Sequence, residues 1–147
     1  KESACRLGID SLNYSVNDAA AAKFPMFDKI LLDAPCSGSG VLARRADLRW
    51  SRKPGDLIQA QALQLRLLEN LAGFLRDKGV LVYSTCSIEP EENWETVQMF
   101  LERHPHFSVD TAVKYVDQRY CDQKGAVMVL PFEHKLTGSF AIRLVKN

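Results

Sequence analysis

The sequence has no long hydrophobic run. No stretch approaches the roughly 20 consecutive apolar residues that a membrane span requires, and the first residues, from Lys1 to Arg6, lack the apolar core of a signal peptide. Apolar residues make up 46% of the 147 residues and charged residues 25%, as in ordinary globular proteins. We therefore expect one cytoplasmic domain with no membrane partner and no obligate protein partner.

Cysteine pairs at metal-ligand or redox spacing are also absent. The chain has four cysteines, Cys5, Cys36, Cys86 and Cys121. They form no Cys-x-x-Cys pair, and no histidine stands near them at ligand spacing. This pattern argues against a structural zinc site and against a dithiol redox module. We expect free thiols in a reducing compartment and no metal.

An excess of charge of one sign is nearly absent, because 19 Lys and Arg residues against 18 Asp and Glu residues leave a net charge of only +1. Any binding to nucleic acid must therefore rely on a local patch or on another part of the protein. The densest basic run comprises Arg44, Arg45, Arg49, Trp50, Arg52 and Lys53. One interpretation is scattered, solvated surface charge. The other is a patch in which Arg44, Arg45 and Arg49 contact the phosphates of a nucleic-acid substrate.

A glycine-rich nucleotide-binding turn is missing as well. Doubly wound α/β folds carry such a turn after their first strand, and no Gly-x-Gly-x-x-Gly pattern occurs here. The segment Gly38-Ser39-Gly40 is rich in glycine, but it follows Asp-Ala-Pro-Cys and not the end of a first strand. We therefore expect the chain to enter the fold partway along.

The first quarter of the chain predicts a helix and two strands. Residues 1–8 are typical of the last turns of a helix, with Gly8 as its cap. Residues 9–16 suggest a short strand. Phe27–Asp33 is nearly continuous in apolarity through Ile-Leu-Leu, which is typical of a strand covered on both faces in a parallel sheet.

The rest of the chain predicts two helices and three more strands. The expected elements are, in order, a helix from Asp56, a turn at residues 77–79, a strand at residues 80–84, a helix from Pro90 that ends at Pro105, and strands at residues 127–130 and 140–145. This order predicts an α/β domain with a mainly parallel sheet and a closing antiparallel pair of strands.

Polar and thiol side chains follow the predicted strands at the points where these strands end. The three segments are Asn17-Asp18, Asp33-Ala34-Pro35-Cys36 and Ser84-Thr85-Cys86-Ser87. Ligands of open α/β sheets bind beyond the carboxyl ends of the strands, so we expect these segments to converge. A single cysteine there is often a small buried residue, and Asp18 alone could simply begin a turn. Two cysteines at equivalent positions favour a catalytic pair.

Two motifs in this region resemble those of a known family. Residues 30–41 (ILLDAPCSGSGV) are similar to the fourth motif of the Nop/Sun family of RNA cytosine-5 methyltransferases, and residues 82–93 (VYSTCSIEPEEN) to its sixth. The resemblance covers nearly the whole chain and is strongest to the bacterial Sun (Fmu) type. It implies the C-terminal part of a Rossmann-like methyltransferase domain over residues 1–147, without the N-terminal glycine-rich part.

The resemblance also implies the reaction and the role of each residue. The expected activity is methyl transfer from S-adenosyl-L-methionine to carbon 5 of a cytosine in RNA, foremost 16S ribosomal RNA, through a covalent adduct with cysteine. Cys86 corresponds to the nucleophile and Cys36 to the thiol that assists release. Asp33, with Ala34 and Pro35, corresponds to the site of the cofactor's methionine end and the cytosine, and Asp18 to the adenine site. The residue types alone do not rank the two cysteines.

Several alternatives stay open at this point. The chain departs from the family pattern at Thr137-Gly138-Ser139-Phe140, where an Asp-Gly-Phe-Phe-like motif is usual. The substrate could be transfer RNA, or the domain could bind RNA without catalysis. DNA is disfavoured by the Thr85-Cys86 pair. Intact Cys36, Cys86 and Asp33 argue for an enzyme, because binding alone requires no thiols.

Overall fold

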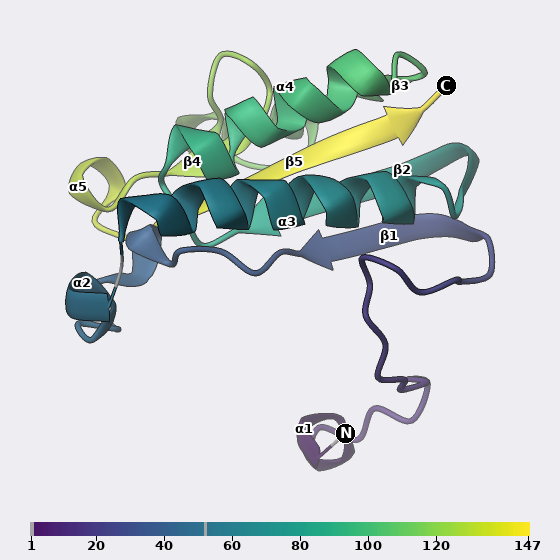
Figure 1. Ribbon diagram of the computed structural model, residues 1–147, viewed down its shortest axis with the longest axis horizontal. Helices are drawn as coiled ribbons and strands as arrows, with labels where there is room; N and C mark the ends of the chain where they lie inside the picture. The colour runs from purple at the N-terminus through teal and green to yellow at the C-terminus, as the bar shows by residue number, and fades with distance from the viewer. Residues whose placement is uncertain (1, 52) are drawn as a thin grey trace.

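The structure is a computed structural model that describes residues 2–51 and 53–147. It contains one open sheet with two long helices, α3 (Pro54–Ala72) and α4 (Trp94–Arg103), packed beside each other on the same face (Figure 1). The α/β class and the predicted alternation of strands and helices are confirmed.

The sheet has the strand order β1-β2-β5-β3, and β4 also pairs with β5. The strands are β1 (Phe27–Asp33), β2 (Leu75–Thr85), β3 (Phe107–Val109), β4 (Val127–Val129) and β5 (Ser139–Lys146). Among the strands of the described residues, only β1 and β2 pair in parallel, and β5 runs antiparallel to β2, β3 and β4. The predicted closing pair is present as β4 and β5. The sheet in this stretch is mixed rather than mainly parallel, because one reversed strand, β5, takes part in three of the four pairings.

Two predicted boundaries move by a few residues. Helix α3 begins at Pro54, and Asp56 stands at its third position, where its carboxylate accepts the Lys53 backbone N–H at 2.9 Å. The predicted turn at residues 77–79 lies inside β2, where the register with β1 shifts between Phe27 and Lys29. Helix α4 is preceded by a short 3₁₀ helix, η2 (Pro90–Glu92), that carries the predicted proline. The short strand β3 was not predicted from the sequence.

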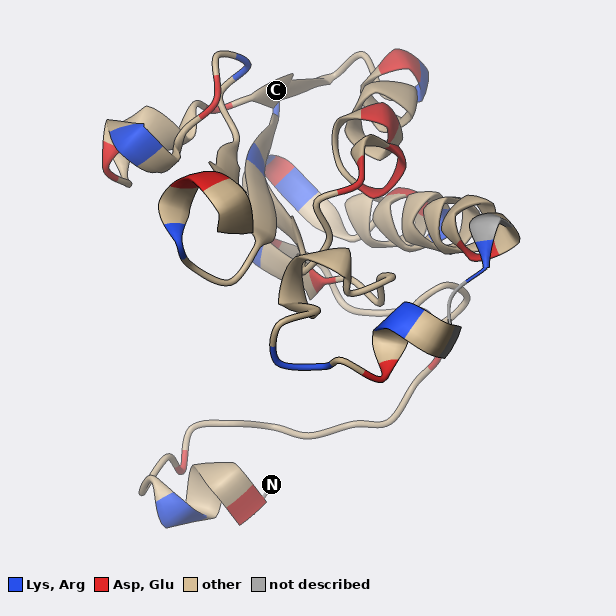
Figure 2. Ribbon diagram, turned by 90° about the vertical axis from the view of Figure 1, so that its left-hand side faces the viewer, with Lys and Arg blue, Asp and Glu red and all other residues tan. Residues whose placement is uncertain are grey.

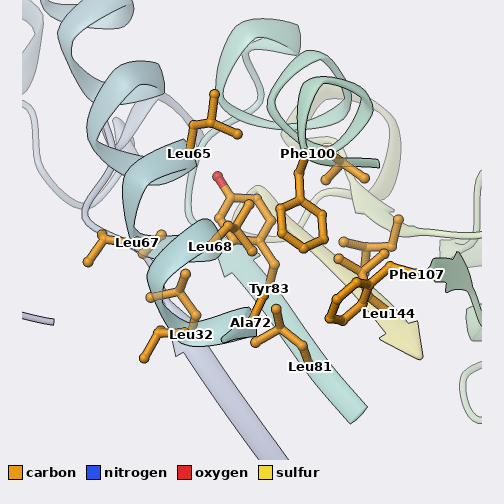
Figure 3. Close-up of a cluster of buried hydrophobic side chains, with 14 of the residues drawn as sticks. Leu32, Leu65, Leu67, Leu68, Ala72, Leu81, Tyr83, Phe100, Phe107 and Leu144 are labelled. Carbon is orange, nitrogen blue, oxygen red and sulfur yellow. The ribbon is translucent and has the colours of Figure 1, made fainter. Parts of the chain in front are cut away.

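The hydrophobic core lies between the sheet and the two helices (Figure 3). Leu68 of α3 and Phe100 of α4 are fully buried against Tyr83 of β2 and Leu144 of β5. Burying side chains of this size contributes roughly 1.5–3 kcal/mol each relative to exposure. This core fixes the ends of β1 and β2, from which the loops described below emerge.

Strand β1 is covered on one face only, which corrects the expectation of two covered faces. Leu32 faces the helices and is buried, whereas its neighbour Leu31 points to the other face and is 70% exposed. The cause is that α3 and α4 lie on the same side of the sheet (Figure 1).

The first part of the N-terminal arm, residues 2–17, extends away from the sheet (Figure 1), whereas Ala19, Ala20 and Phe24 pack against the core. The predicted helix is present as α1 (Glu2–Arg6), and Gly8 has the left-handed φ of 67° expected of a cap. The predicted strand at residues 9–16 is wrong: the segment is exposed and belongs to no sheet. A strand requires a neighbouring strand for its backbone hydrogen bonds, and no described segment pairs with this one.

The remaining elements are short. They are η1 (Ser39–Val41), α2 (Leu48–Ser51), η3 (Ala112–Lys114), η4 (Gln118–Tyr120) and α5 (Pro131–His134). None of the described helices combines the length and the apolar composition that crossing a bilayer requires. Within residues 2–51 and 53–147, no cluster of three or more His, Cys, Asp or Glu side chains suits a metal ion.

Candidate active site

The two motif cysteines meet at the carboxyl ends of β1 and β2. These strands are parallel, and their register places Asp33 opposite Ser84. The loops that follow bring the Sγ atoms of Cys36 and Cys86 to 2.9 Å, although the residues are 50 positions apart. The Cys86 backbone N–H also donates to Cys36 Sγ at 3.3 Å. The predicted convergence of these two segments is confirmed, and both thiols are free and half-buried.

The environment of Cys36 favours its neutral form. Burial, together with the side-chain hydrogen bond to Cys86, raises the pKa of the Cys36 thiol from 9.0 to about 12. Desolvation disfavours the thiolate because the charge loses its contact with water. Near neutral pH, Cys36 is therefore a thiol that can donate a hydrogen bond to the sulfur of Cys86.

Two glycines join the loops backbone to backbone. The Gly40 N–H donates to the Cys86 carbonyl at 3.0 Å, and the Gly138 N–H donates to the Gly40 carbonyl at 2.9 Å. A Cβ on Gly40 would lie 2.7 Å from the Gly138 carbonyl oxygen and 2.8 Å from that of Cys86. Only glycine allows this approach. The segment in which the sequence departs from the family motif thus supports the cysteine loop directly.

A buried carboxylate holds the Cys36 loop to the rest of the site. Glu92 is fully buried, and its Oε1 accepts the Ser37 backbone N–H at 2.7 Å and Gln64 Nε2 at 3.0 Å. Its Oε2 accepts the Ser37 hydroxyl, and its backbone carbonyl accepts the Tyr83 hydroxyl at 2.6 Å. The sequence motifs did not predict this role for Glu92. Nothing local in the sequence distinguishes it from the adjacent Glu91.

Three serine hydroxyls complete the contact between the loops. Ser87 Oγ lies 3.2 Å from Ser37 Oγ and 3.1 Å from Ser39 Oγ. Ser39 Oγ in turn accepts the Ile88 backbone N–H at 3.0 Å. We refer to residues 36–40 and 85–88 together as the thiol loops. Their geometry is fixed by groups within this chain.

The two aspartates of interest are exposed. Asp33 accepts a 3.3 Å hydrogen bond from the Ser84 hydroxyl, and next to it Ala34 is buried while Pro35 is exposed. Asp18 begins a turn, since its Oδ1 accepts the Ala20 backbone N–H at 2.9 Å. That turn is attached to α3 near the helix's C-terminal end, through Asn70 Nδ2 to the Ala19 carbonyl at 2.8 Å. No hydrogen bond among the described residues links Asp18 to the thiol loops.

The predicted basic run divides between two environments. Arg44 and Arg49 line a cleft of about 760 Å³ beside the thiol loops, whereas Arg45 forms an exposed salt bridge with Asp47 at 3.2 Å. Trp50 on α2 is 90% exposed. Lys53 supplies the backbone N–H that Asp56 accepts. Arg52 lies outside the described residues.

The opposite wall of this cleft comes from the segment around α5, which the sequence reasoning had not connected with the site. Phe132, Lys135 and Leu136 line it, and Ser39, Gly40 and Ile88 line the side of the thiol loops. Figure 2 looks onto this end of the molecule, where α2 and α5 lie. The sequence holds one weak indication of this wall, because Phe132 and Lys135 lie a few residues before Gly138, in the region of the family motif. We call this cavity the basic cleft.

Comparison with known proteins agrees with the motifs. The model of the family described as 16S rRNA methyltransferase RsmB/F matches residues 1–145. The chain is 38% identical over 118 residues to the probable ribosomal RNA small subunit methyltransferase B of Bacillus subtilis, covering 78% of the chain and 26% of that protein. It is 39% identical over 123 residues to the methyltransferase B of Pectobacterium atrosepticum, covering 83% and 27%. The chain thus spans about a quarter of the length of these relatives.

Solved structures share the fold. The crystal structure of PH0851 superimposes with a TM-score of 0.90 at 32% identity, over 99% of this chain and 33% of that one. The structure of NSun6 from Pyrococcus horikoshii with SFG gives 0.84 at 28% identity, over 99% and 37%. The predicted resemblance to the Nop/Sun family and the Rossmann-like fold are confirmed.

Proposed function

The chain belongs to the 16S rRNA methyltransferase RsmB/F family, and from this premise we propose that it transfers a methyl group from S-adenosylmethionine to carbon 5 of a cytosine in RNA, with 16S ribosomal RNA as substrate. We propose further that these residues form the C-terminal part of the methyltransferase domain. The observation that carries the proposal is the pair of thiols 2.9 Å apart at the carboxyl ends of β1 and β2.

A thiol pair suits this reaction because carbon 5 of cytosine is a poor nucleophile. Addition of a thiolate forms a sulfur–carbon 6 bond and turns carbon 5 into an enamine-like nucleophile. After methylation, carbon 5 loses its proton to a base, and the sulfur–carbon 6 bond breaks as the ring double bond is restored. The chain must therefore supply a reactive thiolate and a group that assists its departure.

We assign the attack to Cys86 and the assistance to Cys36, as the family resemblance implies. Burial raises the pKa of the Cys36 thiol, and a thiol that stays protonated can act as a hydrogen-bond donor. Beside Cys86, the Cys36 thiol can donate a hydrogen bond to the sulfur as it leaves carbon 6. Asp33 lies at the start of the same loop, and a carboxyl group that shares a proton with cytosine N3 stabilises the adduct.

The residues present fit part of an S-adenosylmethionine site. When bound, this molecule supplies the electrophilic methyl group. Asp33, with Ala34 and Pro35, would hold its methionine end, and Asp18 would accept a hydrogen bond from its adenine. The chemistry is suitable because both carboxylates are exposed and each accepts one hydrogen bond within the described part of the chain. An exposed carboxylate retains capacity for a cationic or N–H donor.

Covalent trapping tests the proposal. The complete protein should form an adduct that survives denaturation with 16S ribosomal RNA transcribed with 5-fluorocytidine, because fluorine at carbon 5 prevents the release step. Cys86→Ala should abolish the adduct, and Cys36→Ala should retain it while losing turnover. An adduct with Cys86→Ala but none with Cys36→Ala would reverse the roles.

Two further outcomes would contradict the proposal. Trapping of transfer RNA in place of 16S ribosomal RNA would change the substrate. Absence of an adduct with either RNA, while RNA still binds, would favour a non-catalytic RNA-binding domain.

A further inference from the structure

We infer that the basic cleft binds an unpaired nucleotide next to the target cytosine, with its base stacked on Phe132 and its phosphates held by Arg44, Arg49 and Lys135. This inference rests on the proposed function, since it places the flanking part of the same RNA. It adds a binding subsite from a segment, residues 131–137, that the catalytic chemistry does not use.

The position of the cleft fits a neighbouring nucleotide. Gly40 and Ile88 line it, and the Gly40 N–H donates to the Cys86 carbonyl at 3.0 Å. The residues that line this side of the cleft therefore belong to the same loops as the two thiols. A cytosine whose carbon 6 reaches Cys86 must be unpaired or flipped out, and in a single-stranded loop the adjoining bases are also open to stacking on aromatic side chains.

The charges of the cleft match a polyanion with flat apolar rings. Arg44, Arg49 and Lys135 line it, and no carboxylate within the described part of the chain lies at salt-bridge distance from any of them. Arg45, outside the cleft, is paired with Asp47. A volume of about 760 Å³ exceeds the needs of a water cluster and falls within the usual range of small-ligand pockets.

Phe132 is exposed but firmly positioned. It is 76% exposed on α5, beside Leu136, which is 50% exposed. His134 fixes this short helix: its Nδ1 accepts the Leu130 backbone N–H at 3.0 Å, and its Nε2 lies 2.9 Å from the Arg119 carbonyl. An aromatic ring held open to solvent among cations is the arrangement by which proteins stack unpaired bases.

Substitutions of Phe132 test the stacking. Phe132→Ala in the complete protein should raise KM for 16S ribosomal RNA roughly 5- to 150-fold, the range reported for loss of one base stack, with kcat changed by less than about threefold. Phe132→Tyr should restore KM because it keeps the ring, and Phe132→Leu should not. Equal behaviour of the Leu and Tyr variants would overturn the stacking role.

A pair of lysines tests the phosphate contact. Lys135 and Lys78 share a left-handed backbone, with φ of 56° and 62°, but Lys78 lies in β2 away from the cleft. Lys135→Gln should reduce the slope of log K against log salt by about 0.7 for single-stranded RNA. Lys78→Gln should leave the slope unchanged. Identical slopes for the two variants would contradict the contact.

Combining an altered RNA with the Phe132→Ala variant locates the bound nucleotide. It also distinguishes failure of the subsite from failure of the proposed methylation. In an oligoribonucleotide substrate, an abasic residue on one side of the target should raise KM for the parent protein but add nothing to Phe132→Ala, since both changes remove the same contact. Additive effects on both sides would overturn the subsite while leaving the methylation intact. A parent protein that methylates no RNA would instead contradict the proposed function.

Discussion

The thiol loops and the two exposed aspartates differ sharply in how the chain supports them. Cys36 and Cys86 are tied together through Glu92, Gly40 and several serine hydroxyls, most of them buried. The carboxylates of Asp18 and Asp33 each accept one hydrogen bond within the described part of the chain and face solvent. A rigid, preformed pair suits bond formation, which requires reacting atoms within a narrow range. Exposed carboxylates suit groups that are completed only by a ligand. Substitutions in the thiol loops should therefore lower the free energy of unfolding. Substitutions of the aspartates should lower ligand affinity instead.

The largest effect is expected from Gly40→Ala. The added Cβ would collide with the backbone oxygens of Gly138 and Cys86, neither of which can rotate away. We expect a loss of roughly 1–3 kcal/mol of unfolding free energy in urea and at least about a hundredfold loss of kcat. Gly55→Ala is the matched control, because nothing lies within 4 Å of its Cβ and alanine favours the helix. Equal stability of the two variants would contradict the rigid junction.

A comparable loss of stability and a smaller loss of kcat are expected from Glu92→Gln. The amide of glutamine keeps the shape of the side chain but replaces one carboxylate oxygen with an NH₂ group. The backbone N–H or the hydroxyl of Ser37 then faces a donor, so that one buried donor loses its acceptor. The expected cost is about 1–3 kcal/mol by urea unfolding, accompanied by lower kcat. Glu95→Gln, on the exposed side of α4, should change the free energy of unfolding by less than about 0.5 kcal/mol. A Glu92→Gln protein as stable and active as the parent would show that the hydrogen bonds of the Glu92 carboxylate are dispensable.

The pH dependence of stability gives a third test of the thiol loops. The folded pKa of Cys36, about 12, lies above the ordinary 9.0, so the folded chain keeps a proton that the unfolded chain releases between these values. The stability from neutral Cys36 is present in full below the unfolded pKa and is lost as pH rises toward the folded pKa. The urea midpoint of unfolding should decrease less between about pH 8 and about pH 10.5 for Cys36→Ala than for the parent protein. Parallel slopes would contradict a buried neutral thiol.

The smallest effect on stability is expected from Asp33→Asn, at the other side of the comparison. The side chain is exposed, so the free energy of unfolding should change by less than about 0.5 kcal/mol. Affinity for S-adenosylmethionine, measured by calorimetry on the complete protein, should fall by about tenfold or more, as when a charged hydrogen-bond partner is removed. Asp28→Asn, at the start of the same strand and paired with Arg76 at 2.9 Å, should leave that affinity unchanged. Equal affinities of the two variants would remove Asp33 from the cofactor site.

The parts of the fold that were predicted correctly are those governed by local pattern. Phe27–Asp33 is apolar enough to be a strand, and proline at position 90 does begin a helical turn. The segment 9–16 failed because strand formation depends on a neighbour, which the residues of the segment cannot reveal. The buried position of Glu92 was invisible for a similar reason, since its main partner, Ser37, stands 55 residues away.

The sequence by itself determined the family, the α/β class and the two cysteine loops, because motif spacing and strand periodicity are local properties of the chain. The tertiary structure decided which groups face one another. It brought the two sulfurs to 2.9 Å, buried Glu92 beneath Ser37, and separated Arg45 from the cleft that Arg44 and Arg49 share with Phe132 and Lys135. Neighbouring positions acquire different environments because burial and charge depend on packing between distant segments.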